Sequence, residues 1–480
     1  MRRYERVVAV VVAALSRANV IEQQRLRETV ALSWPRIVTG FSIMSKRTVD
    51  LAIVGVAVGA EAVAGLALAN AFWTVGKLAF IGLAGGTIAL VSQNYGGEDE
   101  DRAAAVVAAS LLTAVVLAVP VVAAFGLAAE PLVALVGGSP AATAFGATYL
   151  AVVAPGILFE AVNLVASRTY AGVGDTVTPM GVRAAGAVLN VICSATLVFG
   201  LGMGVLGAAL GTTAATGLVT LVFAWGLTGR DYVAGRGGSP LPVGWGTVPD
   251  SALFRQLLRV GAPLVARRVA QGLIVFPLLA VAATFGPVAV AAVGVARQVR
   301  QLLNSFTWGF SIAASTLVGQ ALGAGEEDRA VAYGREITNL SVVIYLFAGA
   351  AVLLLADPIA SVFVDDDATA QTAAFVAVAA VSSVPLGVDG SISGTLRGAG
   401  DTRVPFVATL AGLYLVALPT AYLGTVTTLG VTALYLALVA ETAAPMVVNL
   451  LRFRSGVWLS VARGLNSGEE RVDVDPDPVD

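Results

Sequence analysis

Twelve long apolar segments, each bounded by glycine, proline or charged residues, constrain this chain more than any other feature. They lie near residues 31–58, 62–94, 102–128, 141–166, 179–201, 205–229, 256–284, 288–321, 329–356, 369–394, 404–425 and 429–452. Each exceeds the roughly 20 residues that an α-helix needs to cross the hydrocarbon of a bilayer. Of the 480 residues, 57% are hydrophobic and only 12% are charged, which excludes a soluble protein. The sequence predicts an all-α polytopic membrane protein with twelve transmembrane helices.

Basic residues alternate between the loops and thereby predict the orientation of the chain. Arginines cluster in the loops that follow even-numbered segments, namely Arg102, Arg168, Arg230, Arg236, Arg255, Arg329, Arg335, Arg397 and Arg403. The loops that follow odd-numbered segments contain neither lysine nor arginine. Because short cytoplasmic loops carry the excess of basic residues, we expect a multi-pass protein of the cell membrane with both termini cytoplasmic.

The two halves of the chain repeat each other. SQNYGGEDEDRAA (92–104) aligns with GQALGAGEEDRAV (319–331), and AGVGDTVTP (171–179) aligns with RGAGDTRVP (397–405). Pro35 likewise aligns with Pro263. Since each repeat contains six segments, an even number, both halves enter the membrane from the same side, and an axis along the membrane normal relates them. The repeat predicts two pseudo-symmetric six-helix lobes.

The repeat, together with the glycine, proline and charged residues between the segments, predicts five parts of the chain. We expect a cytoplasmic N-terminal helix over 1–30, an N-terminal six-helix lobe over 31–229 and a cytoplasmic linker rich in glycine and proline over 230–253. A C-terminal six-helix lobe over 254–453 and an acidic cytoplasmic tail over 454–480 follow. We expect the protein to function as a monomer.

The residue types that are missing exclude several function classes. The chain has no histidine and a single cysteine, Cys193, so it has neither an intrachain disulfide nor a thiol-rich metal site. Any proton chemistry near neutral pH must therefore use carboxylates. A net charge of −2 gives no support for nucleic-acid binding. We predict no catalytic residues, no metal site and no cofactor, and we disfavour both a membrane enzyme and a channel.

Asp50 is the strongest candidate for a functional residue, because it lies inside the first apolar segment. An ionised carboxylate at membrane depth costs about 2.5 kcal/mol or more unless it is paired or hydrated. Lys46 lies four residues earlier on the same helical face, so an ion pair with Lys46 is the structural alternative. Glu160, Asp389 and Glu441 are further acids in or near apolar segments, and none has an acidic counterpart in the other half.

Polar stripes on the apolar segments indicate surfaces that face protein or water rather than lipid. The candidates for the substrate path are Lys46, Lys77, Arg297, Arg300, Gln301 and Asn304. The structural alternative is that these side chains bridge helices. At membrane depth, seven basic residues (Lys46, Arg47, Lys77, Arg267, Arg268, Arg297 and Arg300) outnumber the four acids named above. If most of them face the interior, the excess favours anionic or zwitterionic cargo.

The chain resembles the multidrug and toxic compound extrusion (MATE) family, in its prokaryotic, DNA-damage-inducible-F-like branch. The resemblance covers about residues 31–453. It rests on WPRIVTG (34–40), TVDLAIVGVAVGAEAVAGLALAN (48–70), both GDT-containing loops, and LNVICSATLVFGLGMGVLGAALGT (189–212). The resemblance implies two lobes forming a V, and a secondary active antiporter that exports small organic compounds in exchange for protons or sodium. The alternative on the same scaffold is a flippase or exporter of anionic or lipid-linked cargo.

The resemblance also implies a cation site inside the N-terminal lobe. The family places there an Asp on the first span, an Asn and an Asp four residues apart on the fifth, and a Thr on the sixth. Asp50, Asn190 and Thr212 match three of these positions, and Ser194 stands where the second acid is expected. The predicted coupling site is therefore Asp50, Asn190, Ser194 and Thr212, with half the usual negative charge.

Overall fold

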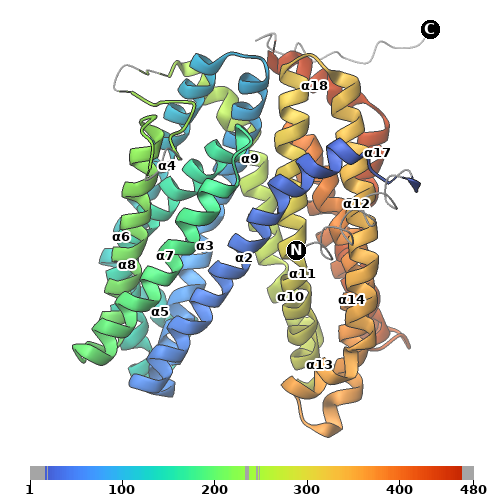
Figure 1. Cartoon of the computed structure of the whole chain (residues 1–480). Coiled ribbons are helices and arrows are strands. Elements are labelled where there is room, and N and C mark those ends of the chain that lie inside the picture. Colours follow the sequence, from blue (N-terminus) through green and yellow to red (C-terminus); the bar gives the residue numbers. More distant parts are fainter. Residues whose placement is uncertain (1–16, 19, 233–236, 245–246, 248, 467–480) are drawn as a thin grey trace, which may run out of the picture.

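The computed structural model describes residues 17–18, 20–232, 237–244, 247 and 249–466, and in this part of the chain it consists of helices and their connections (Figure 1). The N-terminal lobe contains α2 (Gln23–Ala57), α3 (Ala60–Gly96), α4 (Glu100–Leu127), α6 (Pro140–Gly172), α7 (Val177–Ala195) with the π-helical turn η1 (Thr196–Gly200), and α8 (Gly204–Leu227). The C-terminal lobe contains α9 (Ser251–Leu273) with α10 (Val275–Ala283), α11 (Pro287–Gly323), α12 (Glu327–Leu354), α14 (Asp366–Gly398), α15 (Arg403–Ala411) with η2 (Gly412–Ala417) and α16 (Leu418–Val426), and α17 (Thr432–Arg454).

These helices confirm the predicted all-helical fold with two lobes. Ten of the spans in the described chain are long and apolar enough to cross a membrane by composition alone. The other two, α2 and α11, are 35 and 37 residues long, but they carry the charged and polar residues noted above. Their hydropathy is lower for that reason, and the polar side chains must face protein or water.

Several helix boundaries differ from the prediction. α2 begins at Gln23 and runs through residue 31 without a break, since residues 23–34 contain no glycine or proline. Short helices α5 (Ala129–Val136) and α13 (Ala356–Phe363) extend the third and ninth spans. In the segment predicted as a tail, α18 (Val457–Asn466) packs on the C-terminal lobe through Trp458, which is 1% exposed and stacks on Phe453. Residues 1–16 and 467–480 lie outside the described residues.

The two lobes lean together at one end of the molecule and diverge at the other, as the predicted V requires (Figure 1). We call the end with turns 97–99, 173–176, 324–326 and 399–402 the converging end, and the opposite end the diverging end. Between the lobes, α3 packs against α9 and α11, and α2 packs against α11. The contacts α2–α11 and α9–α3 correspond to each other under the sequence repeat, so the packing has the same pseudo-symmetry as the sequence.

A reciprocal pair of hydrogen bonds joins the lobes at the converging end. Gln93 Nε2 donates to the Gly398 carbonyl at 2.6 Å, and Gln320 Nε2 donates to the Gly172 carbonyl at 2.8 Å. We call these two bonds the reciprocal lock. Glycines let the backbones approach beside it: a Cβ at Gly323 would lie 1.9 Å from the Gln93 carbonyl oxygen. The repeated Gln and Gly residues of the sequence thus meet across the lobe boundary.

The repeated GDT loops hold each lobe together next to its proline-containing helix. Pro35 has no N–H to bond to the Ala31 carbonyl in α2, and Thr176 Oγ1 donates to that oxygen at 3.3 Å. In the other lobe, Thr402 Oγ1 donates to the Val260 carbonyl of α9 at 2.8 Å, one turn before Pro263. The loops therefore have a structural role.

Helix α2 belongs to the packing of both lobes. Its first residues, including Leu26 and Leu32, are buried in one cluster with Phe310 and Tyr333 of the C-terminal lobe. Arg25 pairs there with Glu336 of α12 at 2.9 Å. The later part of α2, including Val54, packs in the core of the N-terminal lobe. A single helix therefore packs against both lobes.

Candidate functional site

Asp50 lies in the core of the N-terminal lobe, where α2, α7 and α8 meet. Its side chain is buried, and Asn190 and Thr212 are buried beside it. In the amide orientation that satisfies its neighbours, Asn190 Nδ2 donates to Asp50 Oδ1 at 3.0 Å and to Oδ2 at 3.2 Å. The Asn190 oxygen then accepts from Thr212 N at 3.2 Å and from Thr212 Oγ1 at 2.9 Å. The structure thus brings together three of the four residues predicted for the coupling site.

Ser194, the fourth predicted residue, is also buried in this site. Its hydroxyl faces the Asp50 carboxylate without the geometry of a regular hydrogen bond to any described group. A Cβ at Gly211 would lie 2.7 Å from Ser194 Oγ, so the backbone of α8 passes directly against it. The π-helical turn η1 begins two residues after Ser194, and such turns occur often at functional sites.

Asp50 differs from the other buried acids of the described chain. Among the described side chains, no basic group lies within 4.0 Å of its carboxylate, the distance that defines an ion pair. Each of the others has an arginine partner: Glu160–Arg183 (2.8 Å), Glu336–Arg25 (2.9 Å), Asp389–Arg267 (2.5 Å) and Asp401–Arg452 (2.7 Å). Lys46, one turn before Asp50, does not reach this distance either. The ion pair with Lys46 considered from the sequence does not form.

The residues predicted for the substrate path occupy different places in the structure. Arg297 and Arg300 both pair with Glu441 of α17, at 3.2 and 2.7 Å, inside the C-terminal lobe. Lys77 lies 4.0 Å from Glu160 in the N-terminal lobe. Gln301 is exposed, and Asn304 and Lys46 are half-buried. The two arginines therefore bridge helices, in line with the structural alternative for these stripes.

The C-terminal lobe contains its own buried polar centre around Asp389. Arg267 binds the Asp389 carboxylate and also donates to Thr409 Oγ1 at 2.8 Å, while Asn449 Nδ2 donates to the other carboxylate oxygen at 2.7 Å. The carboxylate is thus neutralised by a cation that belongs to the protein. This arrangement leaves Asp389 no need for an exchangeable ion.

Sequence reasoning missed four arginines that lie inside the bundle. From the sequence, Arg168 and Arg397 are expected in loops, but Arg168 lies within α6, just before its last turn, and Arg397 lies in the last turn of α14. Arg183 and Arg36 lie within α7 and α2. The interruption of an apolar span by Arg36 or Arg183 was the signal that could have found two of them.

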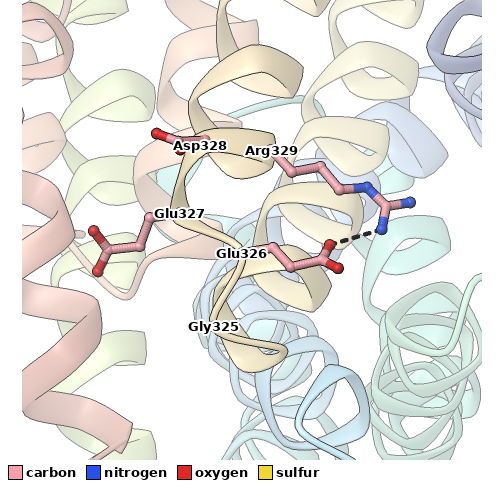
Figure 2. Close-up of a pocket in the computed structure, with 5 residues that line it drawn as sticks. All are labelled: Gly325, Glu326, Glu327, Asp328 and Arg329. Carbon is pink, nitrogen blue, oxygen red and sulfur yellow. Dashed lines mark hydrogen bonds and ion pairs between the residues drawn. The ribbon is translucent and has the colours of Figure 1, made fainter.

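A hollow of about 590 Å³ lies beside the α11–α12 turn, along Gly325–Arg329 (Figure 2). Its lining is a surface turn in which Glu326 and Arg329 pair at 2.7 Å. The hollow belongs to the outer surface of the converging end, whereas Asp50 is buried within the N-terminal lobe. We assign it no role in the chemistry of the site.

Known proteins with similar sequences and folds agree with this architecture. A family model described as MatE matches residues 35–196 and 263–423, one stretch in each lobe. The probable multidrug resistance protein NorM of Bradyrhizobium diazoefficiens is 28% identical over 442 residues, which cover 89% of this chain and 92% of that protein. A protein of the same name from Thermotoga maritima is 26% identical over 318 residues, 65% of this chain and 67% of that one.

The fold has a counterpart among solved structures as well. The crystal structure of MATE in the bent conformation superposes with a TM-score of 0.84 at 22% identity, over 92% of this chain and 97% of that one. Because the family model covers most of both lobes, the chain belongs to the MATE family of multi-pass membrane transporters, which are not enzymes.

Proposed function

We propose that this protein is a secondary active exporter of small organic compounds, driven by a proton or sodium gradient through alternating access of its two lobes. The multidrug resistance names of its relatives support this class of cargo. The loop arginines support an orientation with both termini and the converging end in the cytoplasm. In that orientation the described conformation faces outward, and the reciprocal lock seals the cytoplasmic side.

The observation that carries the proposal is the unpaired, buried carboxylate of Asp50. A buried carboxylate without a fixed cation is stabilised by a bound proton or metal cation, and the transport cycle can exchange that ion. The carboxylate and the Ser194 and Thr212 hydroxyls offer oxygen ligands of the kind that sodium accepts, while the Asn190 amide holds the carboxylate through its N–H groups. One negative charge fits one monovalent cation.

Helix α2 supplies a physical route from ion binding to movement of the lobes. Asp50 lies in the N-terminal lobe, while the first third of the same helix is anchored on α12 through Arg25 and Glu336. A change in the charge of Asp50 alters the packing of α2 against α7, where Asn190 holds the carboxylate. An ion that binds the two arrangements of the lobes with different affinity shifts the equilibrium between them.

The Asp50→Asn variant tests the coupling site. Asparagine keeps the shape and the contact with Asn190 but cannot exchange a cation, so we expect ion-driven export to fall to background. Export of a dye from proteoliposomes is measured with an imposed proton gradient and, separately, with a sodium gradient. The gradient that drives the wild-type protein identifies the coupling ion.

Asp366→Asn is the matched control, because Asp366 is an exposed acid at the start of α14 and the chemical change is the same. We expect wild-type export from this variant. Full gradient-driven export by Asp50→Asn, in protein that elutes as a monodisperse species, would overturn the assignment of the coupling site.

A second candidate function is the export or flipping of anionic or lipid-linked cargo on the same scaffold. Its support is the excess of basic side chains at the junction of the lobes, where Arg183 and Arg267 already occupy the nearby carboxylates. Parallel efflux assays with a cationic dye and an organic anion separate the two candidates.

A further inference from the structure

Four guanidinium groups at the junction of the lobes have no carboxylate partner in the described part of the chain. Arg36 of α2 and Arg168 of α6 belong to the N-terminal lobe, and Arg268 of α9 and Arg397 of α14 belong to the C-terminal lobe. We propose that these four residues, the junction arginines, form a binding site for an organic anion that carries phosphate or carboxylate oxygens.

The contacts that the junction arginines do make are with neutral groups. Arg397 donates to the Ser311 carbonyl at 2.7 Å and to the Ser311 and Ser315 hydroxyls at 3.2 Å. Arg268 donates to Gln271 at 3.1 Å. Within the described residues, the Arg168 side chain makes no hydrogen bond, and Arg36 Nε is buried without a partner. Their charges are therefore not neutralised by the protein.

Direct contacts place two of these side chains where the two lobes meet, and the backbone next to a third is bonded to the other lobe. Arg36 crosses to the C-terminal lobe and lies 5.4 Å from the ring centre of Trp308. The Arg397 side chain extends from the C-terminal lobe toward the N-terminal lobe. The Cδ of Arg397 lies 3.5 Å from the position that a Cβ at Gly85 of α3 would occupy. Arg168 lies one turn before Ala171, whose carbonyl accepts a hydrogen bond from Thr316 of the other lobe at 2.9 Å.

The electrostatic surroundings of Arg168 are repulsive. The charged neighbours that act most strongly on it are Arg36, Arg397, Arg183 and Arg268, all of them arginines. The acids that could offset them, Glu160 and Asp389, are bound by Arg183 and Arg267. Like charges that are partly removed from water destabilise one another, and a bound anion relieves this repulsion.

The chemistry of arginine selects the class of ligand. The planar guanidinium donates two parallel hydrogen bonds to carboxylate and phosphate groups, which an organic cation cannot accept. Four unneutralised groups favour a ligand with at least two negative charges. Since both lobes supply arginines, ligand affinity depends on how the lobes are arranged, as alternating access requires.

Anion binding to the junction arginines can be measured without an ion gradient. Only the use of this site in transport rests on the proposed function. Fluorescence anisotropy of carboxyfluorescein, a multivalent organic anion, is titrated with purified full-length protein in detergent. Ethidium serves as the cationic probe. We expect saturable binding of the anion that weakens with salt, and a loss of about tenfold or more in affinity, about 1.4 kcal/mol, for Arg168→Gln and Arg397→Gln.

Arg463→Gln is the matched control, because Arg463 is an exposed arginine of α18, paired with Glu327, and the loss of charge is the same. Arg168→Lys keeps the charge and should retain more affinity than Arg168→Gln. The binding is measured without an ion gradient, so failure of the coupling assignment leaves this test intact. Absence of saturable anion binding, or equal weakening by Arg463→Gln, would overturn the proposal.

A lipid headgroup and a soluble compound share this ligand chemistry, and a competition experiment separates them. The protein is placed in nanodiscs of phosphatidylcholine with or without phosphatidic acid, and carboxyfluorescein binding is repeated. If phosphatidic acid displaces the dye from the wild-type protein but not from Arg168→Gln, the result supports a lipid occupant. Dye binding unaffected by phosphatidic acid supports a soluble organic anion.

Discussion

At the scale of single residues, the two lobes differ in the groups that surround a buried carboxylate. Asp389 is permanently paired with Arg267, whereas Asp50 has an amide and two hydroxyls as neighbours. Arg267 thus neutralises the charge of Asp389, whereas under the proposed function the charge of Asp50 is neutralised by the ion that it takes up. The difference arises from single side chains in otherwise similar lobes.

Restoring the acid that Ser194 replaces should increase the affinity for sodium. In Ser194→Asp a second carboxylate faces Asp50, and two adjacent negative charges favour a shared proton or cation. Because bound ligand stabilises the folded state, sodium should raise the melting temperature of this variant more than that of the wild type. The gain should grow as pH rises, since fewer protons then compete for the two carboxylates.

The same substitution on the exposed Ser361 of α13 provides the control for this measurement. Ser361→Asp should show the sodium dependence of the wild type. If Ser194→Asp were equally insensitive to sodium over the whole pH range, the geometry assigned to the site would be wrong.

At the scale of helices, the approach of α3 to α11 at the converging end depends on glycine. A Cβ at Gly96 would lie 2.2 Å from the Gln320 carbonyl oxygen, and one at Gly323 would lie 1.9 Å from that of Gln93. Both contacts are with backbone atoms, which cannot rotate away as a flexible side chain can. The reciprocal lock therefore forms only because both positions lack a side chain.

Gly323→Ala should shift the protein away from the described conformation. The added methyl group prevents the close contact of α11 with Gln93, so the converging end opens and the diverging end closes. Spin labels on Leu135 of α5 and Val362 of α13, which are 82% and 77% exposed, report the separation at the diverging end. We expect a shorter mean distance between the two labels, with Cys193 replaced by serine.

Gly294→Ala controls for the change of a glycine to alanine within the same helix, because a Cβ there meets nothing within 4 Å. Its label distances should match those of the parent protein. An unchanged distance distribution in Gly323→Ala would contradict the role of the lock.

At the scale of the whole molecule, the proposed orientation makes a direct prediction for labelling in intact cells. A cysteine at Leu135, at the diverging end, should react with a membrane-impermeant maleimide, because this end faces outward. A cysteine at the exposed Asp101, at the converging end, should react only after the cells are permeabilised. The opposite pattern would reverse the assigned topology.

The sequence predicted the architecture well because hydropathy and the internal repeat are local properties of the chain. It placed the twelve spans and matched Gln93 with Gln320, which the structure shows as partners in the lock. It did not predict that, among the buried acids of the described residues, Asp50 is the one without an ion pair, because Arg183–Glu160 and Arg267–Asp389 join residues 23 and 122 positions apart. Such pairings depend on how the helices pack.

The reciprocal lock has a consequence for the kind of interface that joins the lobes. Each lobe supplies one glutamine donor and one glycine carbonyl acceptor, so each carries both halves of the contact that joins it to the other. This is the property of an isologous interface, in which one surface is complementary to itself. The single chain thus has, between its lobes, the geometry of a homodimer interface. Elsewhere the two lobes differ, since the buried Asp389 has a counter-ion in Arg267 and the buried Asp50 has none among the described side chains.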